Sequence, residues 1–83
     1  MASFDRTDTS SKVINIVSKK LSIDKNSVTE SSTLQGLGAD SLDTFKILLD
    51  LQDKFGIEID DDAADNFSDL KNVVEFIHEK RTK

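Results

Sequence analysis

The stretch that decides the fold is ADSLDTFKILLDLQDKFG, from Ala39 to Gly56. Its apolar residues recur at helical spacing, and this pattern predicts a helix from about Ser41 to Phe55. Asp40 is the predicted N-cap, because its short side chain can accept a hydrogen bond from the first turn. Gly56 stands where a helix-ending glycine belongs. The hydroxyl of Ser41 is therefore expected at the junction between a glycine-containing loop and an apolar helix.

The predicted helix carries two apolar stripes, although a helix in a small bundle needs only one. With about 100° between successive residues, the first stripe is an ordinary core face, made of Thr44, Ile47, Leu48, Leu51 and Phe55. The second stripe is displaced to one side and is made of Leu42, Phe45 and Leu49. Exposed apolar patches tend to mark docking sites, so the second stripe predicts a docking surface beside Ser41. The alternative is a wider core that buries both stripes.

Two further main helices are predicted outside this stretch. The first lies near Ser10 to Leu21, where apolar residues recur at helical spacing, and Ser10 or Thr9 could cap its start. The last begins after Ser68, a good cap, and runs to about Lys80. Its predicted buried stripe consists of Leu70, Val73, Val74 and Ile77.

A long connector and a short helix complete the expected order. The connector runs from Ser22 to Ala39, with Leu34 and Leu37 as its expected anchors and Val28 as a third. The segment from Ile57 to Phe67 predicts one or two helical turns behind three consecutive aspartates, since negative charge is favourable at a helix N-terminus. The expected fold is all-α: a small bundle of three main helices plus one short helix, with the long connector between the first and second helices.

Length, charge and composition limit the possible functions. The 83 residues predict one domain over 1–83, with its core at about 10–80. The sequence gives no strong reason for an oligomer, so a monomer is expected. The net charge of −5 argues against binding nucleic acid or an anionic membrane surface. The chain has no cysteine, hence no disulfide and no thiolate metal site. No apolar run is long enough to span a bilayer, and the start suits neither a secretion signal nor an organelle transit peptide, so a cytoplasmic location is expected. The open alternative is a mature organellar form.

The motif LGADSL, Leu37 to Leu42, resembles the attachment motif of acyl carrier proteins. The layout around it is also similar: an amphipathic helix, a long connector, the motif at the start of the second helix, a short helix and a last helix. The resemblance covers roughly Val13 to Lys80. It implies a non-catalytic carrier in which Ser41 receives 4′-phosphopantetheine from coenzyme A, through a phosphopantetheinyl transferase that uses Mg²⁺. The thiol of this arm would hold an acyl group as a thioester for fatty-acid or specialised lipid or polyketide enzymes.

The same resemblance implies roles for other residues. Asp40 and Leu42 would flank the cofactor, and acyl-processing enzymes with basic docking patches would contact Asp43, Phe45, Leu49 and Asp53. The groove that shelters the acyl chain would be lined by Leu51, Ile59, Ala64, Phe67, Val73 and Phe76. The departures are a base, Lys46, where fatty-acid carriers usually have an acid, and Gln35-Gly36 before the motif. With these departures, a specialised carrier with its own partners fits at least as well as the housekeeping carrier of fatty-acid synthesis. Phe67 and Val73 are bulky for a deep groove, which indicates a shallower acyl site or a short or polar cargo. The open alternatives are an aminoacyl or peptidyl carrier domain and an unmodified helical adaptor.

Other candidate sites are weaker. The run Asp60-Asp61-Asp62 lacks the alternating ligands and central glycine of a calcium loop, and it predicts a solvated helix start rather than a metal site. His78, the only histidine, is expected to be exposed near the end of the last helix, with no catalytic role. Phe45 is expected to be partly exposed, and Phe4 to lie in a frayed terminus.

Overall fold

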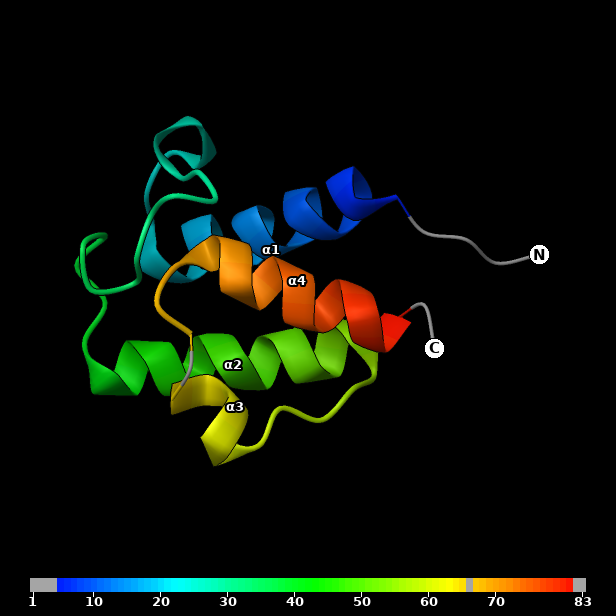
Figure 1. Ribbon diagram of the computed structural model, residues 1–83. Helices are drawn as coiled ribbons and strands as arrows, with labels where there is room; N and C mark the ends of the chain where they lie inside the picture. The colour runs from blue at the N-terminus through cyan, green and yellow to red at the C-terminus, as the bar shows by residue number, and fades with distance from the viewer. Residues whose placement is uncertain (1–4, 66, 82–83) are drawn as a thin grey trace.

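The computed structural model describes residues 5–65 and 67–81, and its main elements are four α-helices (Figure 1). These are α1 (Arg6–Leu21), α2 (Ser41–Phe55), α3 (Asp61–Asp65) and α4 (Leu70–Arg81), with a short 3₁₀ turn, η1 (Lys25–Ser27). Helix α1 packs against both α2 and α4 (Figure 1). No strand occurs in the described residues, so the predicted all-α bundle is confirmed. The prediction for Phe4 falls outside the described residues.

The core is built from the apolar stripes of the three long helices. Val13 and Val17 of α1 belong to one buried cluster with Ile47 and Leu51 of α2. Helix α4 buries its whole predicted stripe, and the connectors add Val28 and Ile59. Leu34 and Leu37, the expected anchors of the first connector, are only partly buried, so Val28 is the connector's most buried apolar residue. Burial of these side chains is the main favourable contribution to the fold.

Helix α1 begins four residues earlier than predicted, and its predicted cap is wrong. Asp5 occupies the N-cap position, and its carbonyl accepts hydrogen bonds from the N–H groups of Asp8 and Thr9. Thr9 and Ser10 lie within the helix rather than at its start, and both are buried. Thr9 faces α4, where its hydroxyl has polar partners, and this contact explains why a residue of good capping type stands within the helix.

The start of α4 also differs from the prediction, because Asp69 rather than Ser68 caps it. The Asp69 carboxylate accepts from the N–H of Asn72 at 3.1 Å. The N–H groups of Leu70 and Lys71 donate to connector carbonyls, each at 2.9 Å. The connector thus satisfies helix-terminal donors that would otherwise lack partners. The connector is fixed on its other side by Glu30, which accepts two hydrogen bonds from Arg6 of α1, at 2.9 and 2.7 Å.

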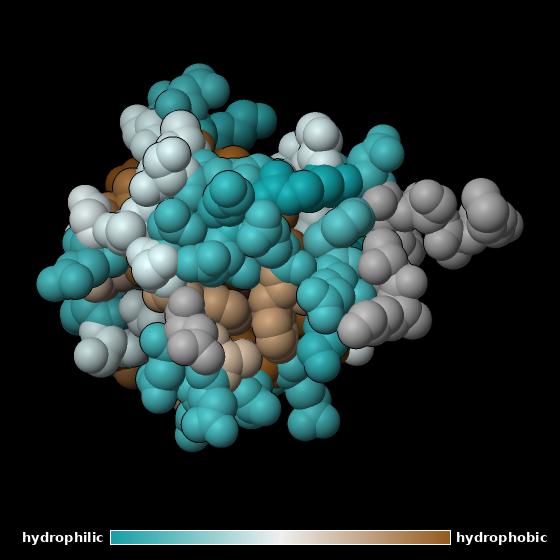
Figure 2. All heavy atoms as spheres, in the orientation of Figure 1, coloured by the Kyte–Doolittle hydropathy of each residue, from teal (hydrophilic) through white to brown (hydrophobic). Residues whose placement is uncertain are grey.

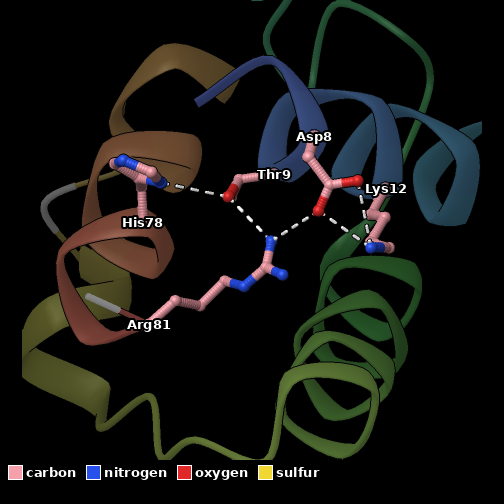
Figure 3. Close-up of polar contacts among 5 residues, drawn as sticks. All are labelled: Asp8, Thr9, Lys12, His78 and Arg81. Atoms are coloured by element: carbon pink, nitrogen blue, oxygen red, sulfur yellow. Dashed lines mark hydrogen bonds and ion pairs between the residues drawn. The ribbon is translucent and has the colours of Figure 1, made fainter. Parts of the chain in front are cut away.

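A polar cluster joins the start of α1 to the end of α4 (Figure 3). Arg81 donates to the Asp8 carboxylate at 3.1 Å and to the Thr9 hydroxyl at 2.9 Å. Nδ1 of His78 lies 3.2 Å from the same hydroxyl, so His78 is half-buried and partnered rather than exposed as predicted. Lys12 donates to both oxygens of Asp8. Hydrogen bonds from Lys12 and then from Arg81 hold the pKa of Asp8 below its usual value.

These ion pairs predict a loss of stability in acid. The hydrogen bonds from Arg6 lower the pKa of Glu30, as those from Lys12 lower the pKa of Asp8. A lowered folded-state pKa gives stability that is present above the unfolded pKa, about 4, and is lost as the pH falls through the folded value. We expect the urea midpoint, followed by circular dichroism, to drop below about pH 4, and to drop less in the Asp8→Asn, Glu30→Gln double variant.

The matched control for this experiment is Glu58→Gln. Glu58 is exposed and forms no ion pair within residues 5–65 and 67–81, so its removal should leave the acid-induced drop as in the wild type. A double variant whose midpoint falls as steeply as that of the wild type would assign the acid sensitivity to other carboxylates.

Candidate functional site

At the junction before α2, the hydroxyl of Ser41 takes no part in capping the helix. Asp40 is the N-cap, as predicted, and its carboxylate accepts from the Asp43 N–H at 2.8 Å. Asp43 accepts in return from the Asp40 N–H at 3.4 Å, which completes a capping box. Ser41 occupies the first helical position, is exposed, and its side chain makes no hydrogen bond within the described chain. A cap is therefore excluded as the role of this serine.

A backbone hydrogen bond and two glycines shape the loop before Ser41. The N–H of Ala39 donates to the carbonyl of Leu34 at 2.9 Å. Gly38 has φ +94°, a backbone conformation that favours glycine. A Cβ on Gly36 would lie 2.7 Å from Oγ1 of Thr33, so the glycine also permits a close approach. This loop and the first turn of α2 surround an open hollow of about 490 Å³, lined by Gln35, Ala39, Asp40, Ser41 and Thr44.

The second apolar stripe of α2 is exposed, as predicted. Leu42 is 60% exposed, Phe45 59% and Leu49 47%, and they are the large apolar side chains most open to solvent in the described chain. Their spacing of three and four residues places them side by side along the helix. The first residue of the stripe follows Ser41 directly. An apolar contact surface therefore begins at the exposed hydroxyl.

Most of the acidic side chains at the start of α2 and along it already have partners within the protein, so few are available to bind another protein. Asp40 and Asp43 are engaged in the capping box. Lys20 of α1 pairs with Asp50 at 3.1 Å. Asp53 is exposed, and so is the base Lys46 on the same helix. The charge around the exposed stripe is consequently mixed.

A cleft of about 260 Å³ opens near this junction. Of the residues predicted for a groove, Ala64, Phe67 and Val73 line it. The lining residues that were not predicted come from the connector, from α2 and from the segment that leads into α4: Thr33, Leu34, Gln35, Thr44, Leu48, Ser68, Asp69 and Leu70. Gln35 and Thr44 line both the cleft and the hollow around Ser41, so the two spaces are adjacent.

The other predicted groove residues lie elsewhere. Leu51 and Ile59 are buried in the core and do not line the cleft. Phe76 lies in a neighbouring hollow of about 320 Å³ with Ala63 and Asn72, where its ring meets Phe67 edge-on at a centroid distance of 5.5 Å. Figure 2 shows apolar surface gathered between α4 and α3, under a hydrophilic rim. The predicted groove is therefore divided between a cleft, a second hollow and the core.

The aspartate run before and within α3 acts at the helix start. Asp60 accepts from the Ala63 N–H at 2.8 Å. Within the described residues, no group of three or more His, Cys, Asp or Glu side chains is arranged to hold a metal ion. Among the helices that the structure describes, none has the length and apolar character needed to cross a membrane.

Comparison with known proteins agrees with this geometry. A family model described as a phosphopantetheine attachment site matches residues 11–77. A curated relative, an acyl carrier protein of Guillardia theta, is 44% identical over 70 residues, which cover 83% of this chain and 86% of the relative. A solved structure of an acyl carrier protein from Enterococcus faecalis, described for its high thermal stability, superposes with a TM-score of 0.75 at 30% identity, over 92% of this chain and 98% of that one.

Sequence, fold and family model lead to one assignment. The match spans most of the chain, from α1 to α4, and includes the junction with the exposed Ser41. The chain belongs to the acyl carrier protein family, whose members are not enzymes and carry acyl groups on a covalently attached 4′-phosphopantetheine.

Proposed function

We propose that Ser41 carries the 4′-phosphopantetheine arm. The observation that supports this most strongly is a hydroxyl that is exposed, free of any capping role and next to an apolar cleft. Its position at the first turn also suits a phosphodiester, because the N–H groups of Ser41 and Leu42 find no acceptor in the described chain and the helix end is partly positive. When attached, the arm supplies the thiol that holds the acyl group as a thioester.

The cleft beside Ser41 is the proposed shelter for the acyl chain. Its apolar lining includes Leu48, Phe67 and Val73, which exclude water from a hydrocarbon chain. Its rim is polar, with Thr33, Gln35 and Thr44 among the lining residues. This mixture, together with the modest volume, supports the short or polar cargo that the sequence favours. The monomeric state, the single domain over 1–83 and the cytoplasmic location stay predictions from the sequence.

The exposed stripe of α2 is the proposed docking surface for the transferase and the acyl-processing enzymes. Leu42, Phe45 and Leu49 supply apolar contact area beside the modified residue. Asp53 and the two capping-box residues, Asp40 and Asp43, would meet basic groups on a partner. Since Asp50 is already paired with Lys20, we assign most of the affinity to the apolar contacts and the partner selection to the mixed charges.

Removing the central side chain of the stripe should weaken docking without unfolding the protein. We expect Phe45→Ala to lower kcat/KM of the phosphopantetheinyl transferase about tenfold, mainly through a higher KM, as for an aromatic contact residue. Steady-state kinetics with varied carrier concentration measure this effect. Lys25→Ala, an exposed change on η1, is the control and should keep wild-type kinetics. Equal kinetics for Phe45→Ala and wild type would remove Phe45 from the docking surface.

The experiment that tests the proposed function locates the attached group. The full chain is incubated with coenzyme A, Mg²⁺ and a phosphopantetheinyl transferase, and its intact mass is measured. We expect a gain of one phosphopantetheine, and tandem mass spectrometry after proteolysis should place it on Ser41. Modification at another hydroxyl would refute the site, and no modification by any of several transferases would support an unmodified adaptor.

A further inference from the structure

Four basic side chains gather at the end of the bundle opposite Ser41. They come from three helices: Lys12 from α1, Lys54 from α2, and Lys80 and Arg81 from α4. Together with Phe55, Gly56 and Ile57 they line a hollow of about 480 Å³, here named the basic pocket. The chain has a net charge of −5 and only 11 Lys and Arg residues, so four of them in one pocket is a marked concentration.

Helix-end electrostatics explain only part of this cluster. Lys54 lies in the last turn of α2, and Lys80 and Arg81 lie in the last turn of α4, where cations are favourable. Lys12, in contrast, lies in the middle of α1. Asp8 is the carboxylate that pairs with Lys12 and Arg81. Lys54 and Lys80 form no ion pair with a carboxylate in the described chain, so the basic pocket keeps an excess of positive charge.

The basic pocket combines one largely buried, partnered cation with two exposed lysines. The Arg81 side chain is only 9% exposed, is held by Asp8 and Thr9 (Figure 3), and lies 5.0 Å from the centroid of the Phe55 ring. Phe55 and Ile57 are half-buried and add apolar surface. Lys54 and Lys80 are exposed, and Nζ of Lys80 lies 5.4 Å from the centroid of the Phe76 ring. A lysine side chain is flexible, so both ammonium groups can be reoriented towards a ligand. The arrangement resembles the anchor and rim of a protein contact surface.

We propose that the basic pocket is a second docking surface, which binds an acidic segment of a partner protein. Carboxylates of that segment would pair with Lys54 and Lys80, and an apolar side chain between them would lie on Phe55 and Ile57. A protein segment fits better than a small anion, because small-ligand sites enclose most of their ligand whereas this hollow is open and its most buried cation is already partnered. The net negative charge of the chain argues against an anionic membrane.

The position of the basic pocket indicates what a partner bound there would do. Ser41 and Lys54 are separated by 13 residues of one helix, or about 20 Å at about 1.5 Å per residue. A partner bound at the basic pocket would leave Ser41 and the exposed stripe accessible. Tethering at one end would raise the effective concentration of the other end for an enzyme in the same assembly.

The test uses acidic peptides and charge reversal on the full chain. The peptides have seven residues, a central phenylalanine, and from zero to six flanking glutamates, and binding is followed by ¹⁵N NMR titration. We expect affinity to rise with the number of glutamates and to fall with added salt, with shifts at Lys54, Phe55, Ile57 and Lys80. Replacing the central phenylalanine by glycine should weaken binding. The Lys54→Glu, Lys80→Glu variant should lose at least tenfold in affinity.

Control variants and other anions make the outcome decisive. Lys19→Glu, Lys25→Glu reverses two exposed charges at the other end of α1 and in η1, and should bind as the wild type does. If the charge reversal lowers the melting temperature, Lys54→Gln, Lys80→Gln replaces it. The proposal is overturned if no peptide binds, if the control loses as much affinity, if inorganic phosphate binds the same residues as tightly, or if phosphatidylglycerol vesicles bind the protein in preference to the peptides.

Discussion

Ser41→Ala is expected to abolish attachment of 4′-phosphopantetheine and, with it, all acyl loading. The substitution removes one oxygen, which is the atom that would form the phosphodiester. That oxygen has no hydrogen-bond partner in the described chain, and the capping box between Asp40 and Asp43 does not involve it. Alanine is well tolerated within a helix, so the free energy of unfolding should change by no more than about 0.5 kcal/mol. Intact mass and urea unfolding of the same sample measure both effects.

Two companion variants define what this result means. Ser31→Ala removes another exposed hydroxyl, from the connector, and should be modified at the wild-type rate. Ser41→Thr keeps a hydroxyl but adds a methyl group, and it tests whether the transferase requires an unhindered oxygen. Continued modification of Ser41→Ala would show that another residue is the attachment site. A large loss of stability would show that the Ser41 hydroxyl has a structural role after all.

Helix α2 could be predicted to the residue because its signals are local. The Asp40 cap, the helical spacing of the apolar residues and Gly56 at φ +64° all lie within one stretch. The start of α1 could not be predicted in the same way. Thr9 is a residue type that often caps helices, yet its hydroxyl is engaged by His78 and Arg81, about 70 residues later in the chain. Contacts of that separation leave no periodic signal in the sequence.

The candidate site shows the same division between local and tertiary determinants. Exposure of Phe45 follows from its place on the helix relative to the core face, and the sequence was sufficient to predict it. The lining of the cleft depends on how the connector folds over α2, which places Leu34 at the cleft and leaves Leu51 in the core. The pairing of Asp50 with Lys20 likewise depends on helix packing. These features required the three-dimensional arrangement.

Ile47→Ala is expected to be the most destabilising of the substitutions considered for α2. Ile47 is 1% exposed and packs in the core shared by α1, α2 and α4. Truncation of a buried isoleucine to alanine costs about 2–5 kcal/mol, through lost apolar burial and the cavity that remains. Domains are stable by about 5–15 kcal/mol, and small ones bury a smaller share of their surface. We therefore expect a large fall in the urea midpoint, or an unfolded chain at room temperature.

Comparison with Phe45→Ala separates packing from docking on a single helix. Phenylalanine loses more atoms on truncation than isoleucine does, but Phe45 is 59% exposed, so its loss should change the unfolding free energy by only about 0.5 kcal/mol or less. If Ile47→Ala does not fold, Ile47→Val, with an expected cost of about 0.5–1.5 kcal/mol, can be compared with Phe45→Ala in its place. If Phe45→Ala destabilised the protein as much as Ile47→Ala, the second stripe would be part of the core. A small cost for Phe45→Ala combined with impaired modification would instead assign the two stripes to different tasks, one to folding and one to partner binding.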